Sequence, residues 1–154
     1  MKKPPPHKEI SNGLASHRME MVKLATAINK KFEVSDIEYN SNNTSYSIIT
    51  VKKIKQLYNI KDRVNFIIGT DAFAKLNTWY KAEELKTLVH FIVFPRKGDK
   101  IEAIREQLKK DNWDFEITNT EYIDISSTEV RNGTSDNINE KVKDYIKNNE
   151  LYLC

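Results

Sequence analysis

Three consecutive hydroxyl residues followed by an arginine are the stretch of this chain best suited to chemistry. Ser126, Ser127 and Thr128 stand where a helix is expected to begin. They come directly after the strand expected from Glu121 to Ile125. Backbone N–H groups at a helix start lack partners within the helix and favour anions. Arg131 lies one turn later, on the same side as the hydroxyls. The pattern suits a phosphate chain, but on spacing alone an ordinary helix N-cap is the simpler interpretation.

A glycine and an aspartate end the clearest strand of the sequence. Val64 to Gly69 is an almost continuous apolar run, and Asp71 follows shortly after it. Open α/β sheets bind ligands beyond the carboxyl ends of their strands. Asp71 could accept hydrogen bonds from ribose hydroxyls there, or it could cap the short helix expected through Lys75. The sequence leaves both interpretations open.

Two adjacent aromatic residues, Trp79 and Tyr80, stand in a loop before a helix expected from Lys81 to Leu88. Either ring could stack on a flat ligand, although for an isolated pair a plug in the core is the simpler interpretation. A second, basic loop carries Arg96 directly after another apolar strand. Both loops therefore join the list of places where a ligand could bind.

Length and composition indicate a single domain with one hydrophobic core. The chain has 154 residues, 39% of them hydrophobic, and its net charge of +3 gives no reason to expect nucleic acid. Its one cysteine, Cys154, excludes an internal disulfide and a metal site built on cysteines. No apolar run approaches the length of a membrane span, and the Lys- and Pro-rich N-terminus lacks a signal region. We therefore expect a cytoplasmic protein without a membrane partner.

Helices and short strands alternate along the sequence, which predicts an α/β fold over residues 1–154, a parallel sheet with helices on both faces. The expected helices are Gly13–Lys30, Tyr46–Tyr58 with Ser45 as its cap and a buried stripe of Ile48, Val51, Ile54, Leu57 and Tyr58, Lys81–Leu88, Ile101–Lys110 and Val142–Asn149. The expected strands are Phe32–Ile37, Val64–Gly69, His90–Phe94, Asp114–Thr118 and Glu121–Ile125. His17, on the apolar stripe of the first helix, is expected to be hydrogen-bonded and half-buried.

These motifs, in this order and spacing, resemble the bacterial nicotinate mononucleotide adenylyltransferase family, which belongs to the nucleotidyltransferases with a Rossmann-like fold. The similarity runs nearly end to end. The segments that carry it are Pro5-Pro6-His7-Lys8, His17-Arg18, Phe32-Glu33-Val34-Ser35-Asp36-Ile37-Glu38, Ser45-Tyr46-Ser47, Phe66-Ile67-Ile68-Gly69-Thr70-Asp71, Trp79-Tyr80, Pro95-Arg96 and Ile125-Ser126-Ser127-Thr128-Glu129-Val130-Arg131. Each segment is a weak signal alone, and the resemblance rests on their joint order.

The resemblance implies a reaction and its partners. The 5′-phosphate of nicotinate mononucleotide would attack the α-phosphorus of ATP, with Mg²⁺ on the phosphates, to give nicotinate adenine dinucleotide and pyrophosphate. For ATP, it implies contacts from Gly69, Asp71, Arg96, Ile125, Ser126, Ser127, Thr128 and Arg131. For the mononucleotide, it implies Lys8 near a phosphate, Trp79 stacked on the nicotinate ring, and backbone groups near Ser47 and Tyr80 on the carboxylate. The family usually has threonine where Ser47 stands, so a hydroxyl is kept.

The opening segment of that family has no counterpart in these 154 residues. The family begins with a strand, a glycine-rich loop and a His-x-Gly-His motif that contacts the ATP phosphates. In this sequence His7 precedes Lys8 and not a glycine-histidine pair, so it does not match that motif. We therefore assign no catalytic residue. Loss of that βαβ unit, about 30 residues, would leave an edge of the strand 64–68 unpaired, at about 1–3 kcal/mol for each buried backbone group. The chain alone is then expected to be poorly stable, to pair differently, or to be completed as an oligomer or by another polypeptide.

Two alternatives to a nicotinate mononucleotide adenylyltransferase stay open. The chain could be a catalytically incomplete remnant that keeps the mononucleotide pocket and binds nucleotide or a partner chain. It could also be a different member of the superfamily, such as a pantetheine-phosphate or nicotinamide-specific transferase. The segments Ser45-Tyr46-Ser47 and Trp79-Tyr80 argue against this second alternative.

Overall fold

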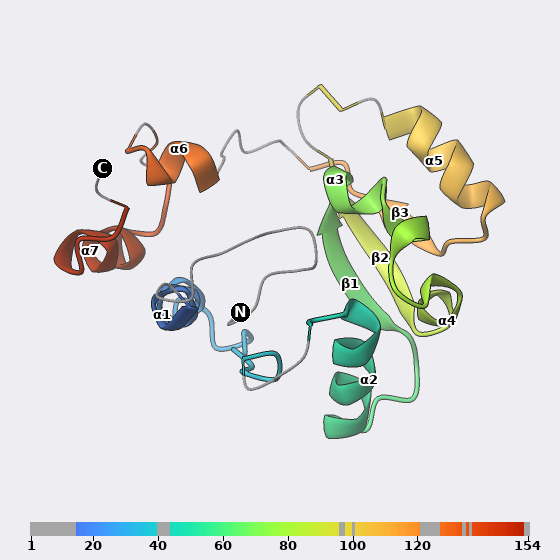
Figure 1. Ribbon diagram of the computed structural model, residues 1–154, viewed down its shortest axis with the longest axis horizontal. Coiled ribbons are helices and arrows are strands. Elements are labelled where there is room, and N and C mark those ends of the chain that lie inside the picture. The colour runs from blue at the N-terminus through green and yellow to red at the C-terminus, as the bar shows by residue number, and fades with distance from the viewer. Residues whose placement is uncertain are drawn as a thin grey trace. The chain divides into compact units, whose positions relative to one another are not determined.

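The computed structural model describes residues 15–39, 44–95, 98–99, 101–120, 127–133, 135 and 137–152 of the chain. The chain forms two compact units (Figure 1). One unit runs from Tyr46 to Asp124, and the other combines Met1–Ser45 with Ile125–Cys154. The expectation of a single domain over residues 1–154 stays a prediction. Across the described ranges, no helix is both long enough and apolar enough to cross a membrane.

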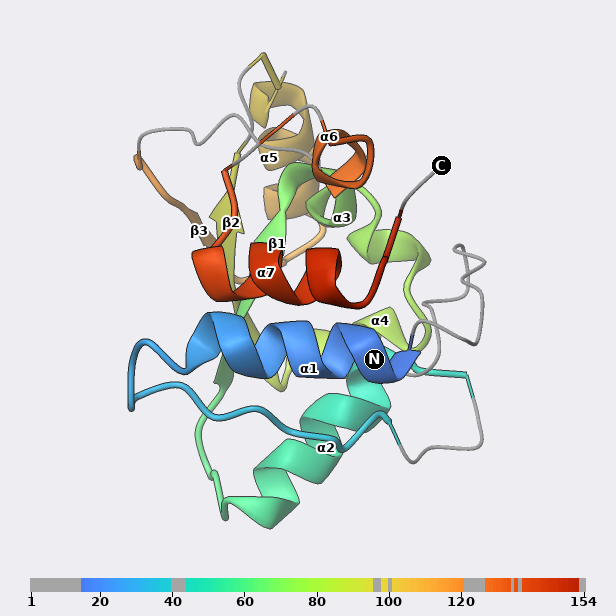
Figure 2. The same cartoon turned by 90° about the vertical axis from the view of Figure 1, so that its left-hand side faces the viewer.

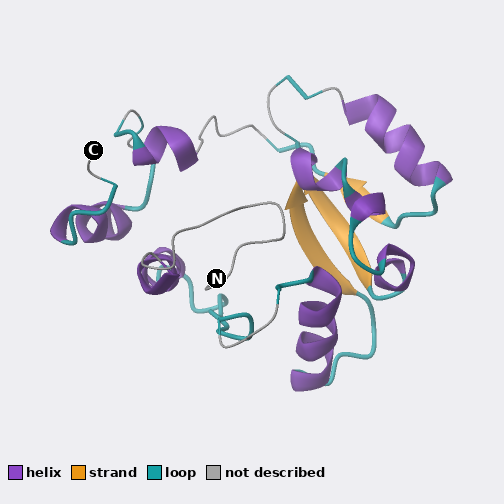
Figure 3. Cartoon of the chain, viewed as in Figure 1, coloured by secondary structure: helices purple, strands orange, loops and turns teal. Residues whose placement is uncertain are grey.

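A parallel sheet is the centre of the unit 46–124 (Figure 3). In the described residues it has the order β1 (Val64–Gly69), β2 (Val89–Phe94) and β3 (Phe115–Ile117), so that β1 forms one edge. The aromatic residues of the strands lie in register, with Phe66 opposite Phe91 and Phe91 opposite Phe115. The strand predicted at 64–69 is confirmed, β2 begins one residue before the prediction, and β3 is shorter than predicted.

The helices of this unit pack on one face of the sheet. The longest of them are α2 (Ser47–Leu57), α4 (Ala82–Lys86) and α5 (Ile101–Lys110). The connections β1–α4–β2 and β2–α5–β3 cross the sheet in the same direction, and right-handed crossovers place both helices on the same side. The side chains that form the common core are Ile48, Val51, Ile68, Phe73, Leu76, Leu85, Val89, Phe91, Val93, Leu108 and Trp113. Ile67 points to the opposite face, where it is 66% exposed.

Asparagines in the left-handed conformation end two of these helices. Asn59 (φ 51°) follows α2 and Asn112 (φ 60°) follows α5. Beyond them, the N–H of Ile60 donates to the carbonyl of Lys55 at 2.9 Å, and the N–H of Trp113 donates to the carbonyl of Leu108 at 3.0 Å. These bonds satisfy carbonyls that a helix end would otherwise leave free. The second one also returns Trp113 to the core, where it is buried.

The two ends of α2 differ from the prediction. Tyr46, not Ser45, is the N-cap residue, and its side chain makes no capping hydrogen bond. Ile48 and Val51 of the predicted stripe are buried, whereas Leu57 and Tyr58 are exposed. The reason is that only the first turns of the helix lie over the core, so the apolar period continues past the surface that could bury it.

Two helices lie side by side in the other unit (Figure 2). They are α1 (Ala15–Thr26) and α7 (Glu140–Asn148). The Nδ1 of His17 lies 2.9 Å from the hydroxyl of Tyr145, and the two rings are 5.8 Å apart. His17 is half-buried. The prediction of a half-buried, hydrogen-bonded histidine is therefore confirmed, and its partner comes from the far end of the sequence.

The strand predicted at Phe32–Ile37 is wrong. Residues 32–36 form no regular secondary structure, and Phe32 is 59% exposed. The Oγ of Ser35 accepts a hydrogen bond from the N–H of Ile37 at 3.3 Å. The carbonyl of Asp36 accepts one from the N–H of Tyr39 at 2.7 Å. Short polar side chains that bond to the local backbone compete with strand pairing, and here they form a turn.

The remaining boundaries shift by a few residues. α1 ends at Thr26, whose hydroxyl donates to the carbonyl of Val22 at 2.8 Å, so it is shorter than the predicted 13–30. α4 is shorter than the predicted 81–88. α7 begins earlier than predicted because Asn139 caps it, with its Oδ1 accepting from the N–H of Lys141 at 3.0 Å. The strand predicted at 121–125 lies outside the described residues.

Candidate functional site

The carboxyl end of β1 carries two of the predicted site residues. Gly69 is the last residue of β1 and the N-cap of the short helix α3 (Thr70–Phe73). Asp71 is exposed and lies within the first turn of α3, so the interpretation of Asp71 as the cap of this helix is wrong. A carboxylate at the carboxyl end of a parallel strand stands where open α/β sheets bind their ligands.

A buried hydroxyl lies between these two residues. Thr70 is 4% exposed, and its Oγ1 has no hydrogen-bond partner among the described residues. Burial of a hydroxyl without a partner costs about 1–3 kcal/mol. The sequence did not signal this feature, because a threonine after a strand has the same pattern as an ordinary cap.

Trp79 is anchored to the core by its edges. Its ring meets Phe66 at 6.1 Å with an interplanar angle of 68°, and Phe91 at 6.1 Å with an angle of 86°. Both are edge-to-face contacts, which aromatic rings favour. Trp79 is nonetheless only half-buried. It therefore combines the packing expected of a core plug with an accessible surface beside the loop.

Tyr80 connects this loop to the start of α2. Its ring lies 4.5 Å from the ring of Tyr46 at an interplanar angle of 34°, and Tyr80 is 49% exposed. Tyr46 directly precedes Ser47, the first residue of α2. The structure thus brings together three predicted residues, Ser47, Trp79 and Tyr80. Sequence reasoning missed Tyr46 as their link, because nothing in its local pattern points to a tyrosine in a distant loop.

A group of charges joins α2 and α4 beside these aromatic residues. Lys52 of α2 donates a hydrogen bond to Glu84 of α4. The Nζ of Lys81 lies 3.8 Å from the other oxygen of Glu84. The hydrogen bond from Lys52, together with the two positive charges, holds the pKa of Glu84 below its ordinary value. Glu84 is therefore ionised at neutral pH and carries the negative charge that both lysines face.

The hydroxyl and arginine group lies in the other unit. Ser127 and Thr128 are exposed residues that open α6 (Ser127–Arg131). The guanidinium of Arg131 donates to the hydroxyl of Thr128 at 3.2 Å, which confirms that they share one side of the helix. Four further predicted site residues lie outside the described residues, namely Lys8, Arg96, Ile125 and Ser126. Their roles stay predictions.

A separate polar cluster lies at the amino ends of the strands, away from the carboxyl end of β1. Asp114 lies just before β3, and its carboxylate accepts a hydrogen bond from the guanidinium of Arg63 at 2.6 Å. Its other carboxylate oxygen lies 3.0 Å from the Nδ1 of His90. Burial pushes the pKa of Asp114 upward, but the hydrogen bonds from Arg63 and His90 outweigh burial, and the pKa lies below its ordinary value. The cluster links the entries of three neighbouring strands and has a structural role.

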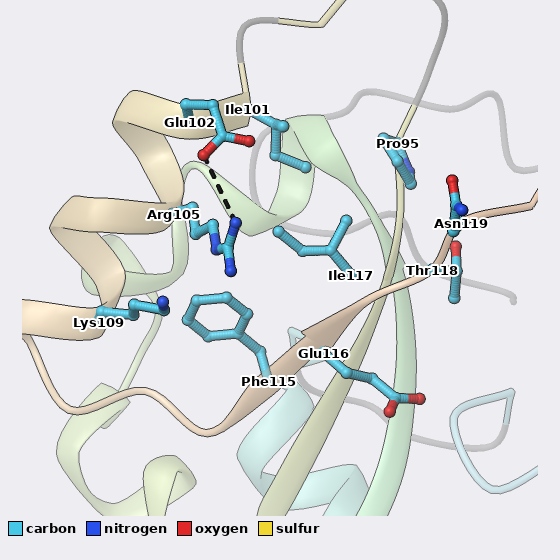
Figure 4. Close-up of a pocket in the computed structure, with 10 residues that line it drawn as sticks. All are labelled: Pro95, Ile101, Glu102, Arg105, Lys109, Phe115, Glu116, Ile117, Thr118 and Asn119. Carbon is cyan, nitrogen blue, oxygen red and sulfur yellow. Dashed lines mark ion pairs between the residues drawn. The ribbon is translucent and has the colours of Figure 1, made fainter.

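A hollow of about 360 Å³ lies between α5 and β3 (Figure 4). Arg105 and Lys109 of α5 approach it from one side and Phe115 of β3 from the other. The charge of Arg105 is partly balanced by Glu102, 3.5 Å away. None of the predicted site residues lines this hollow.

Comparison with known proteins agrees with this fold. The Cytidylyltransferase-like family matches residues 1–133. The probable nicotinate-nucleotide adenylyltransferase of Caldicellulosiruptor bescii is 36% identical, over 96% of this chain and 79% of that protein. The corresponding protein of Fusobacterium nucleatum is 38% identical, over 93% of this chain and 77% of the relative. The nicotinate-nucleotide adenylyltransferase of Bacillus subtilis is 36% identical, over 96% of this chain and 77% of its own length.

Solved structures show the same fold at lower sequence identity. The nicotinic acid mononucleotide adenylyltransferase of Plasmodium falciparum, complexed with NaAD, matches with a TM-score of 0.67 and 21% identity, over 96% of this chain and 77% of that one. The same protein complexed with APC matches with a TM-score of 0.64 and 22% identity, over 88% and 73%. The identities to the bacterial relatives, over more than three quarters of their length, establish the family. This chain therefore belongs to the nicotinate-nucleotide adenylyltransferases, a Rossmann-like family of nucleotidyltransferases that serves NAD biosynthesis.

Proposed function

We propose that the residues at the start of α2 and in the loop before α4 bind nicotinate mononucleotide. We also propose ATP contacts for the hydroxyl residues of α6 and, separately, for the residues at the end of β1. The observation that carries this proposal is the ring contact between Tyr46 and Tyr80, because Tyr46 directly precedes Ser47 and Tyr80 directly follows Trp79. The reaction is the one of the family, which transfers AMP from ATP to nicotinate mononucleotide and releases pyrophosphate.

The mononucleotide side of the site combines an anion site with a stacking surface. Tyr46 is the N-cap residue of α2, and the positive end of the helix dipole near Ser47 suits a carboxylate. Trp79 is half-buried and held by T-shaped contacts with Phe66 and Phe91, and a fixed aromatic ring of this kind suits contact with a flat pyridine. A negatively charged nicotinate would gain from the helix start, whereas a neutral amide would not.

The ATP side is assigned to groups that suit phosphates and a ribose. Ser127, Thr128 and Arg131 would hold the β- and γ-phosphates, with Ile125 and Ser126 beside them. Asp71, exposed at the carboxyl end of β1, would accept hydrogen bonds from ribose hydroxyls next to Gly69. Arg96 and Lys8 complete the proposal as further cations near the nucleotides. The shared orientation of Thr128 and Arg131 supports this assignment.

The chemistry is a direct displacement at phosphorus. An oxygen of the mononucleotide phosphate forms a bond to the α-phosphorus of ATP as the bond from that phosphorus to the β-bridging oxygen breaks, and pyrophosphate leaves with the electron pair. The protein aligns the two anions and neutralises the leaving group, a task for Arg131 and the hydroxyls. Mg²⁺ would enter with ATP, bound to its phosphates. In the ranges the structure describes, no group of three or more His, Cys, Asp or Glu residues is placed to hold a metal ion.

Binding measurements on two variants test the assignment of the loop. Trp79→Leu should weaken nicotinate mononucleotide binding by roughly tenfold, because a stacked aromatic ring contributes about 0.5–1.5 kcal/mol beyond its buried area. Tyr58→Leu is the matched control, since Tyr58 is an exposed aromatic residue at the other end of α2. Equal binding by wild type, Trp79→Leu and the control would refute the assignment.

A binding protein without turnover is the second candidate. Binding of both nucleotides without release of pyrophosphate would support it, and measurable turnover would exclude it. A cytoplasmic location is part of the proposal, since NAD biosynthesis draws on ATP. Completion by an oligomer or a second chain is also part of it, since β1 forms a sheet edge in the described residues.

A further inference from the structure

We infer that Tyr46 is a positioning residue for the nicotinate side of the site, and that its ring holds the Trp79-Tyr80 loop against the start of α2. This inference rests on the proposed binding of nicotinate mononucleotide at that loop. Tyr46 itself touches no reacting atom. It acts on the site through Tyr80, whose ring its own ring contacts.

The backbone of Tyr46 is fixed as the first point of α2. Its carbonyl accepts hydrogen bonds from the N–H groups of Ile49 at 2.9 Å and Thr50 at 3.2 Å. Its half-buried side chain also packs against the core. A residue held in this way can transmit its position to a neighbour. The ring separation of 4.5 Å from Tyr80 lies in the range that aromatic pairs favour.

The loop on the other side of this contact is not in a relaxed conformation. Lys81, directly after Tyr80, has φ 54° and ψ 45°, which is the left-handed region that residues with a side chain rarely adopt. Such a conformation persists only where the surroundings hold it. The described surroundings are the Tyr46 ring on Tyr80, the Nζ of Lys81 at 5.7 Å from the Tyr80 ring, and Glu84, which both Lys81 and Lys52 face.

The position of Tyr46 couples the two halves of the nicotinate site. The ring of the ligand needs Trp79, which stands next to Tyr80 in sequence. The carboxylate needs the N–H groups that follow Tyr46 at the start of α2. Both halves must lie at a fixed separation for one rigid ligand to reach them. Loss of the Tyr46 ring removes the side-chain contact between the helix start and the loop, and this should weaken binding of the mononucleotide but not of ATP.

The test measures dissociation constants on the full chain for nicotinate mononucleotide and for a non-hydrolysable ATP analogue. Tyr46→Leu should weaken mononucleotide binding roughly three- to tenfold, the range of an aromatic pair, and change ATP-analogue binding less than twofold. Tyr46→Phe keeps the ring and should restore binding. Tyr58→Leu is the control for loss of a tyrosine from the same helix. The double variant Tyr46→Leu/Tyr80→Leu should bind the mononucleotide no more weakly than the weaker-binding single variant. Each single variant already removes the contact between the two rings, so the second substitution has no further contact of that pair to remove.

The outcomes separate the two proposals. If the wild-type chain does not bind the mononucleotide, the proposed function fails and the inference fails with it. If the wild type binds and Tyr46→Leu binds equally well, or if the effects of the two single variants add, only the inference fails. If Tyr46→Leu does not fold, variants of its exposed partner Tyr80 test the inference instead. Tyr80→Leu should then lose binding that Tyr80→Phe keeps, and equal binding of these two variants would overturn the inference.

Discussion

The cluster of Arg63, His90 and Asp114 predicts a stability change with a defined dependence on pH. The isosteric variant Asp114→Asn removes the negative charge and keeps the shape of the side chain. Asp114 is 42% exposed, so each of its two contacts is partly screened by water. An exposed pair contributes about 0.2–1 kcal/mol. We expect Asp114→Asn to lower the free energy of unfolding by about 1 kcal/mol at pH 7, which is a drop of about 3 °C in Tm for a chain of this length.

The pH dependence follows from the direction of the shift. The pKa of Asp114 in the folded chain is lower than its ordinary value, because Arg63 and His90 favour the ionised form. The stabilisation is therefore fully present above the unfolded-state pKa, near 3.8, and is lost as the pH falls through the folded-state pKa. The difference between wild type and Asp114→Asn should thus be smaller below about pH 4 than it is at pH 5.

Urea denaturation at a series of pH values measures this difference. The control is Glu106→Gln, which removes a negative charge from an exposed position of α5. The cycle Arg63→Gln, Asp114→Asn and the double variant isolates the coupling between the two side chains. A difference that is as large at pH 3 as at pH 5 would refute the argument that the charge of Asp114 is the stabilising feature.

Three further variants follow from single features of the structure. Thr70→Val should raise the free energy of unfolding by about 1 kcal/mol, because it removes a buried hydroxyl that has no partner in the described part of the chain; a loss of stability in chemical denaturation would show that the hydroxyl is bonded. Glu150→Gly should stabilise the end of α7 by about 0.5–1 kcal/mol, since Glu150 has φ 51°; Glu150→Ala, which keeps the strain, is its control. Tyr145→Phe should cost about 0.5–1.5 kcal/mol through loss of its bond to His17; an unchanged Tm would contradict that bond.

The sequence was a good guide wherever one local pattern determines the structure. The continuous apolar run from Val64 to Gly69 predicted β1, and its glycine and aspartate marked the strand end where the site residues lie. The spacing of Thr128 and Arg131 predicted their contact. The stripe of the first helix predicted that His17 would be half-buried and bonded. In each case the period of a helix or strand fixes which side chains share a face.

Features that depend on distant partners could not be predicted in this way. The ring contact between Tyr46 and Tyr80 joins a helix start to a loop, and neither local sequence indicates that the two tyrosines meet. Residues 32–37 show the opposite case. Their flanks suggested a short strand, although their alternation is poor, and the side chain of Ser35 bonds the local backbone instead.

The burial of a helix face also depends on the surface beneath it. Leu57 continues the apolar period of α2 beyond the core and is exposed. Periodicity therefore predicted the helix itself but not the length over which it is buried.

Turnover by the chain tests the central claim most directly. Purified chain is incubated with MgATP and either nicotinate mononucleotide or nicotinamide mononucleotide, and the dinucleotide product and released pyrophosphate are both quantified. The account predicts equal amounts of nicotinate adenine dinucleotide and pyrophosphate with the acid substrate, and a lower rate with the amide, because the helix start near Ser47 favours a carboxylate. A clear preference for the amide, or no product from a folded sample, would contradict it.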